Sequence, residues 1–188
     1  EASVQDKTAI CILSDKVEVG SMGNTGMESQ VFDNFVAELL NKSGENRPNL
    51  LNKVFCNSSM LSADVGVTYD PIYGSVSDRT NCAYSAYGIS FDKYTGSRGK
   101  AGGSDANAEF IGKLRGILEK NNIQYQVSEL GRVDVGGGGT IAYILANKGV
   151  EVIDCGIPVL SMHSPYEVAS KFDIYSAYRT YKVFYEEA

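Results

Sequence analysis

One histidine and three carboxylates near the ends of apolar stretches are the residues of this 188-residue sequence whose types and positions could together hold a metal ion. His163 lies in LSMHSP, after an apolar run and just before a proline, while Asp15 and Glu18 lie in the glycine-rich SDKVEVGSMGNTG. Asp64 follows another apolar stretch, in LSADVG. Carboxylates and an imidazole together are typical ligands of zinc or manganese. A lone histidine is more often structural, and acidic residues in such loops are more often turn formers, so both interpretations stay open.

The glycine run Gly136–Gly139 in DVGGGGTIAYIL is a second segment that could bind a ligand. Glycines before a helix expose backbone N–H groups that can bind an anion. The segment matches neither GxxxxGK[ST] nor GxGxxG, because no lysine follows it and no acidic ribose partner lies at the right distance. A tight turn, or a backbone that faces a substrate, is therefore a better interpretation than a nucleotide site.

The composition excludes some classes of binding partner. The formal charge is -6, with a sequence pI near 4.8, and no Lys/Arg cluster occurs, which argues against a nucleic acid or an anionic membrane as the main partner. No apolar run of about 18 residues and no basic-then-apolar leader occurs, so neither a membrane span nor a signal peptide is expected. The four cysteines show no CxxC spacing and are expected to be buried free thiols in a reducing cytoplasm: Cys11, Cys56, Cys82 and Cys155.

The pattern of apolar residues indicates strands that alternate with helices. Strands are expected at Lys7–Leu13, Asn57–Asp64, Ala86–Tyr94, Gln124–Leu130, Val150–Asp154 and Val159–Met162. Helices are expected at Glu28–Leu40, at Asp105–Lys120 with Ser104 as N-cap, at Thr140–Gly149, and from Pro165 to about Tyr185. This order predicts the α/β class, as a three-layer α/β/α sandwich with a mixed, mostly parallel sheet that presents site residues at strand ends.

Several segments resemble motifs of the M18 family of zinc aminopeptidases, the aspartyl aminopeptidase or aminopeptidase I type. DKVEVGSMGNTGM resembles the family motif Asp-x-Glu-Glu-Val/Ile-Gly-Ser, and LSADV resembles its Ser-Ala-Asp. GGGGTIA and LSMHSPYEVAS resemble its glycine-rich turn and its Ser-Met-His-Ser motif. SDANAEF and DCGIPVLSMHS agree as well, so the resemblance covers essentially the whole chain and is nearer to the bacterial aminopeptidase I branch.

The resemblance implies two metal ions, usually zinc, with manganese or cobalt as alternatives, held by two histidines and a set of carboxylates. Position by position, Glu18 and His163 would bind one ion and Asp64 the other. The same motif order implies that four residues lie on the substrate side or are structural: Lys100, Gly138, Gly139 and Thr140.

The position of the family's general base holds Val17 in this chain. In the family this residue is the first glutamate of the Glu-Glu pair, which takes a proton from a metal-bound water. Valine cannot accept a proton. The resemblance also implies that the first metal-binding histidine, the bridging aspartate and a lid or dimerisation domain precede this motif. Residues 1–188 are therefore expected to be the C-terminal portion of one catalytic domain without that lid, and to bind one ion or none.

Three functions remain under consideration. The first is a cytoplasmic M18-type metalloaminopeptidase that removes N-terminal residues from peptides through a metal-activated water, with this chain inactive or impaired by itself. The second is a catalytically inactive M18-like assembly or binding subunit, which Val17 motivates. The third is an α/β domain without a site. The family resemblance further implies a peptide substrate and a homo-oligomer, the family's dodecamer.

Overall fold

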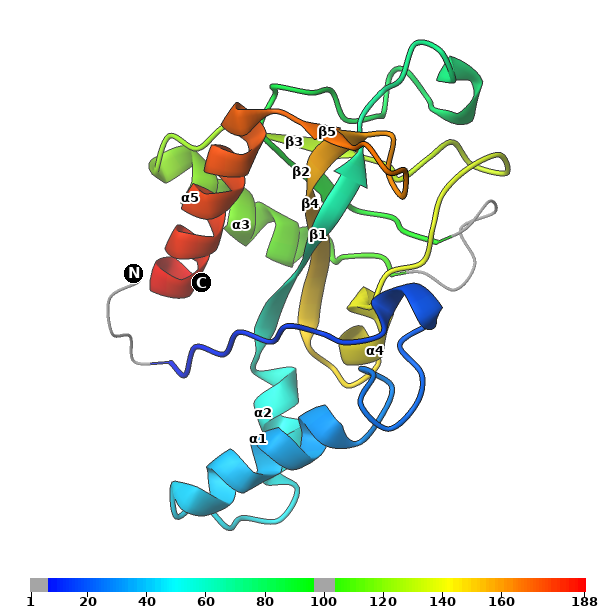
Figure 1. Ribbon diagram of the computed structural model, residues 1–188. Coiled ribbons are helices and arrows are strands. Elements are labelled where there is room, and N and C mark those ends of the chain that lie inside the picture. Colours follow the sequence, from blue (N-terminus) through cyan, green and yellow to red (C-terminus); the bar gives the residue numbers. More distant parts are fainter. Residues whose placement is uncertain (1–6, 97–103) are drawn as a thin grey trace.

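A mixed five-stranded sheet forms the centre of the computed structural model, which describes residues 7–96 and 104–188 (Figure 1). Its order is β1 (Ser59–Val67), β4 (Glu151–Leu160), β2 (Ile89–Asp92) and β3 (Tyr125–Ser128), and β5 (Val168–Ala169) pairs with β4. Nine residue pairs join β1 to β4 and four join β2 to β3, both in parallel, whereas three and two pairs join β4 to β2 and to β5 in antiparallel. The predicted mixed, mostly parallel sheet is confirmed.

Helices cover both faces of this sheet, because successive side chains of a strand point to opposite sides. Ile153 and Cys155 of β4 belong to one buried apolar cluster, with residues of the two helices on that face. Val152 belongs to a second cluster, on the other face. The helices of the first face are α3 (Ala108–Lys120) and α5 (Lys171–Glu187), and those of the second are α1 (Val31–Lys42), α2 (Leu50–Cys56) and α4 (Ala142–Ala146). The three-layer α/β/α prediction is therefore confirmed.

Strand β4 is longer than the sequence suggested, because the two strands expected at Val150–Asp154 and Val159–Met162 are one. Proline cannot donate a backbone hydrogen bond to a ladder, so Pro158 inside a long strand must lie where no such bond is needed. In the structure Pro158 falls between Gly156, the last residue paired with β2, and Val159, the first paired with β5. No antiparallel pairing in the described chain depends on its missing N–H.

The helices start a few residues later than expected, and the start differs most clearly for α3 and α5. Asn107, not Ser104, caps α3, with its Oδ1 accepting the backbone N–H of Phe110 at 2.8 Å. Ser104 is held elsewhere, because its N–H and C=O both bond to Thr95. The last helix starts at Lys171 behind the cap Ser170, not at Pro165, because Val168 and Ala169 form β5 before it.

The apolar segment Lys7–Leu13 is not a strand, contrary to expectation, although Figure 1 shows it extended. Leu13 is 93% exposed, and the hydroxyl of Tyr185 donates to the carbonyl of Ile10 at 3.1 Å. A strand needs a neighbour to satisfy its backbone groups, and the described residues pair none with this segment.

All four cysteines are free, as expected, but only Cys155 is buried. Cys11 and Cys56 are exposed because one lies in that unpaired segment and the other ends α2 at the surface. Within the described residues, no helix is both long and apolar enough to cross a membrane.

Candidate functional site

His163 and Glu18 face each other although 145 positions separate them in the sequence. Nε2 of His163 lies 3.8 Å from Oε2 of Glu18, and both side chains are exposed. His163 belongs to the turn that follows β4, and Glu18 belongs to η1 (Val17–Val19), a single 3-10 turn. An imidazole nitrogen and a carboxylate oxygen at this distance could share one cation. The structure thus brings together two of the three predicted ligands.

Asp64 is not gathered into the same group. It lies in the middle of β1 and not at its end, opposite Gly156 of β4, and its Oδ1 accepts the N–H of Val65 at 2.7 Å. Over residues 7–96 and 104–188, no set of three or more His, Cys, Asp or Glu side chains could hold a metal ion. The pair of Glu18 and His163 therefore fits part of a zinc coordination shell, and the described residues do not complete a two-ion centre.

The loop that carries Glu18 is closed by its own contacts. Thr25 donates to Oδ2 of Asp15 at 2.9 Å, and the N–H of Ser21 bonds to the carbonyl of Lys16 at 2.8 Å. A Cβ on Gly26 would lie 2.0 Å from the carbonyl oxygen of Ser21, so only glycine fits there. Asp15 is thus the turn former that its loop position suggested, and the loop sets the direction of Glu18.

Val17 is the first residue of η1 and is half-buried beside Glu18. Its side chain carries no proton acceptor, so it cannot act as a general base in any geometry.

The turn that carries His163 is held by a residue that the sequence analysis missed. Oε1 of Glu167 accepts the backbone N–H of His163 at 2.5 Å. The N–H of Ser164 bonds to the carbonyl of Ser161 at 3.0 Å, and the hydroxyl of Ser164 donates to the carbonyl of Tyr166 at 2.8 Å. No pattern of residue types singles out Glu167; only the fold of the turn places it against His163.

The glycine-rich turn is tightly packed, as one interpretation of its sequence predicted. A Cβ on Gly136 would lie 2.9 Å from the carbonyl oxygen of Val76, and the carbonyl of Gly138 accepts the N–H of Gly96 at 2.8 Å. Gly139 is exposed. Lys100, the other residue expected near a substrate, lies outside the described residues.

Thr140 ends this turn and is tied to the sheet. Its hydroxyl donates to Oδ2 of Asp154 at 2.9 Å and accepts the N–H of Ala142 at 3.3 Å. Burial raises the pKa of Asp154, and hydrogen bonds from Ser62, Thr140 and Thr95 oppose that effect. The Thr140 hydroxyl is therefore used to solvate a buried carboxylate.

Asp154 belongs to a polar row across the sheet that the sequence did not reveal. The register aligns Ser62 of β1, Asp154 of β4, Asp92 of β2 and Ser128 of β3, and all four are buried. Ser128 donates to Oδ1 of Asp92 at 2.5 Å. Hydroxyl groups thus satisfy the buried carboxylates, which is the usual condition for burying such groups.

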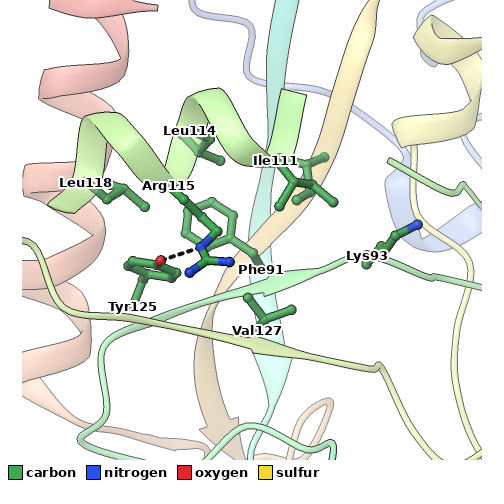
Figure 2. A pocket seen from close by; sticks show the side chains of 9 residues that line it. Phe91, Lys93, Ile111, Leu114, Arg115, Leu118, Tyr125 and Val127 are labelled. Atoms are coloured by element: carbon green, nitrogen blue, oxygen red, sulfur yellow. Dashed lines mark hydrogen bonds between the residues drawn. The ribbon is translucent and has the colours of Figure 1, made fainter. Parts of the chain in front are cut away.

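Figure 2 shows the apolar cavity between α3 and the strands β2 and β3. Its volume is about 10 Å³, and the hydroxyl of Tyr125 accepts from Nε of Arg115 at 2.9 Å along its edge. A space of this size holds at most one water molecule, and its lining is mostly apolar. None of the predicted ligands lines it, so the candidate site remains the pair at Glu18 and His163.

Comparisons with known proteins agree with the motif resemblance. A family model described as aminopeptidase I zinc metalloprotease (M18) matches residues 1–185. A probable M18 family aminopeptidase 1 of Clostridium acetobutylicum is 53% identical over 178 residues, which are 95% of this chain and 38% of that protein. The chain thus spans about two fifths of the length of the curated relatives that it matches.

Solved structures show the same likeness. The crystal structure of aminopeptidase I from Clostridium acetobutylicum matches with a TM-score of 0.82 and 53% identity, covering 90% of this chain and 36% of that one. An M18 family aminopeptidase from Thermotoga maritima matches with a TM-score of 0.88 and 39% identity, covering 92% of this chain and 39% of that one.

Proposed function

This chain belongs to the aminopeptidase I zinc metalloprotease (M18) family, and we propose that it takes part in removing N-terminal residues from peptides. The observation that carries this proposal is the 3.8 Å approach of Nε2 of His163 to Oε2 of Glu18. These are the two residues that the family motifs assign to one ion. Their approach therefore supports a shared catalytic role better than a structural role for a solitary histidine.

Zinc is the metal that this proposal names, with manganese or cobalt as alternatives. A carboxylate and an imidazole are ordinary zinc ligands, and Asp64 stays a proposed ligand of a second ion. The described residues hold no group of three such ligands, and affinity rises with ligand number and charge. We therefore expect this chain by itself to bind one ion weakly, or none.

The chain alone is proposed to be inactive as a peptidase. Val17 lacks a proton acceptor at the general-base position, and the coordination shell is incomplete among the described residues. In line with its coverage of the relatives, residues 1–188 are proposed to correspond to the C-terminal portion of one catalytic domain and not to the family's lid or dimerisation domain.

The partners proposed for the chain follow from the family. They are a peptide substrate near Lys100, Gly138, Gly139 and Thr140, and further copies of the chain in a homo-oligomer, in the cytoplasm. The exposed backbone of Gly139 supports a contact with a substrate, whereas the bonds of Thr140 and Gly138 favour a structural role for those two.

Zinc titration combined with peptidase assays tests the proposal. Purified chain is titrated with Zn²⁺ by calorimetry, alongside the variants Glu18→Gln and His163→Ala, and each protein is then assayed on aminoacyl p-nitroanilides. We expect weak binding to the wild type, loss of binding in both variants, and no hydrolysis by any of them. Measurable Zn²⁺ binding that is equal in wild type and His163→Ala would overturn the assignment of the site.

A catalytically inactive assembly or binding subunit is the second candidate, and Val17 is the observation that favours it. The two candidates differ in the activity of the natural protein. Aminopeptidase activity in the natural protein with Val17 in place would exclude the inactive subunit. Activity that arises only in a Val17→Glu variant would favour it.

A further inference from the structure

The turn after β4 carries two non-glycine residues in the left-handed region. Ser161 has φ of +60° and His163 has φ of +65°. L-residues rarely adopt this region, and such backbone strain persists only where surrounding contacts compensate for it. One of these strained residues, His163, is assigned to metal binding by the family motifs. The contact that holds its backbone therefore matters for the proposed function.

Glu167 supplies that contact. Its Oε1 accepts the backbone N–H of His163 at 2.5 Å, four residues back along the chain. A charged acceptor makes a shorter and stronger hydrogen bond than a neutral one. The other bonds of the turn, from the N–H of Ser164 to Ser161 and between Ser164 and Tyr166, leave the N–H of His163 to Glu167.

Packing around the imidazole of His163 does little to fix its direction. Both side chains of the candidate pair are largely exposed, at 66% for His163 and 71% for Glu18. With little packing around it, the imidazole is directed mainly by the backbone from which it projects. A change of φ at His163 would turn Nε2 away from Glu18.

We propose that Glu167 is a positioning residue that holds His163 in its left-handed conformation, so that Nε2 faces Glu18 before any ligand arrives. This inference rests on the proposed function for its consequence, because the prepared pair would then receive a cation without reordering the turn. Glu167 does not touch the cation or the substrate in this scheme.

The test uses the fact that His163 is the sole histidine of the chain. Labelling with ¹⁵N-histidine gives one backbone amide signal, which reports on the bond to Glu167 directly. In Glu167→Ala we expect that signal to move upfield and to exchange faster with solvent, while the urea midpoint of the whole protein stays unchanged. In Glu167→Gln, which keeps an acceptor oxygen, the signal should remain closer to wild type than to the alanine variant.

Zn²⁺ titration of the same proteins measures the consequence. Loss of a group that orients a metal ligand typically weakens metal binding by about 10–100-fold, and we expect a fall of that size in Glu167→Ala with partial rescue in Glu167→Gln. Glu38→Ala is the matched control, because it removes an exposed carboxylate of α1 that the described part of the chain pairs with Lys42, far from His163 in the sequence. It should leave both the amide signal and the Zn²⁺ affinity at wild-type values.

The amide signal tests the positioning role of Glu167, and the Zn²⁺ titration tests the proposed metal function. An amide signal in Glu167→Ala identical to wild type overturns the positioning role. If the signal changes as expected but wild-type chain does not bind Zn²⁺, Glu167 still positions His163 and the proposed metal function fails. If Zn²⁺ binds and Glu167→Ala binds it as tightly as wild type, the consequence drawn for the cation is wrong.

Discussion

The carboxylate of Asp173 accepts the backbone N–H of Gly88 at 2.7 Å and thereby ties α5 to the start of β2. Its second oxygen accepts the N–H of Ala86 at 2.8 Å. Ala86 and Gly88 both have positive φ, so this loop needs contacts that hold its unusual shape. Asp173 is fully buried, and its two bonds fix where β2 enters the sheet.

Replacing Asp173 with alanine should therefore destabilise the fold strongly. The buried N–H of Gly88 and the partly buried N–H of Ala86 would lose their acceptor, and an unsatisfied buried donor costs about 1–3 kcal/mol. We expect the free energy of unfolding in urea to fall by about 2–5 kcal/mol. Asp78→Ala is the control, because the exposed Asp78 accepts a comparable backbone bond from Thr80. Similar losses in both variants would contradict the anchoring role of Asp173.

Gly26 should resist substitution for a steric reason. A Cβ there would lie 2.0 Å from the carbonyl oxygen of Ser21, and the loop that directs Glu18 would have to open. We expect Gly26→Ala to lower the free energy of unfolding by about 1–3 kcal/mol. Gly112→Ala in α3 meets open space and should instead raise it by about 0.5–1 kcal/mol. Urea unfolding measures both, and two changes of the same sign would refute the steric explanation.

Local periodicity predicted most helices and strands of this fold. The apolar faces of α1 and α3 recur at three- and four-residue steps within one segment, so their position could be inferred without knowing what they pack against. The N-terminal run Lys7–Leu13 carries an equally apolar pattern and yet is no strand. Pairing depends on a neighbour that periodicity cannot supply, and for the same reason the two strands expected at Val150–Asp154 and Val159–Met162 are one strand, β4.

The candidate site was likewise predictable only in part. The types of Glu18 and His163, together with the family motifs, were sufficient to predict that these two meet. The sequence could not reveal Glu167, because its role depends on the left-handed backbone of His163. Asp154 was missed because the register of three strands creates its polar surroundings.

Thr140→Val should loosen the glycine-rich turn. Valine has the shape of threonine but cannot donate to Asp154 or accept the N–H of Ala142. We expect a loss of about 1–3 kcal/mol in the free energy of unfolding, together with faster amide exchange across Gly136–Gly139. Thr140→Ser keeps the hydroxyl and should lose less. Unchanged exchange in Thr140→Val would show that the turn is held without this bond.

Asp154 should make the stability of the chain depend on pH. Burial raises the pKa of Asp154 above the 3.8 of a free aspartate, so the folded chain binds more protons than the unfolded chain between those two pKa values. By linkage, this carboxyl lowers stability as pH rises through that window, from about pH 4 upward. Urea unfolding of wild type and Asp154→Asn over a series of pH values measures the effect. The difference in unfolding free energy should shift in favour of Asp154→Asn as pH rises, and should then level off once the folded carboxyl is fully ionised. A difference that stays constant over the series, in Asp154→Asn and in Asp154→Ala alike, would mean that Asp154 titrates no differently in the two states.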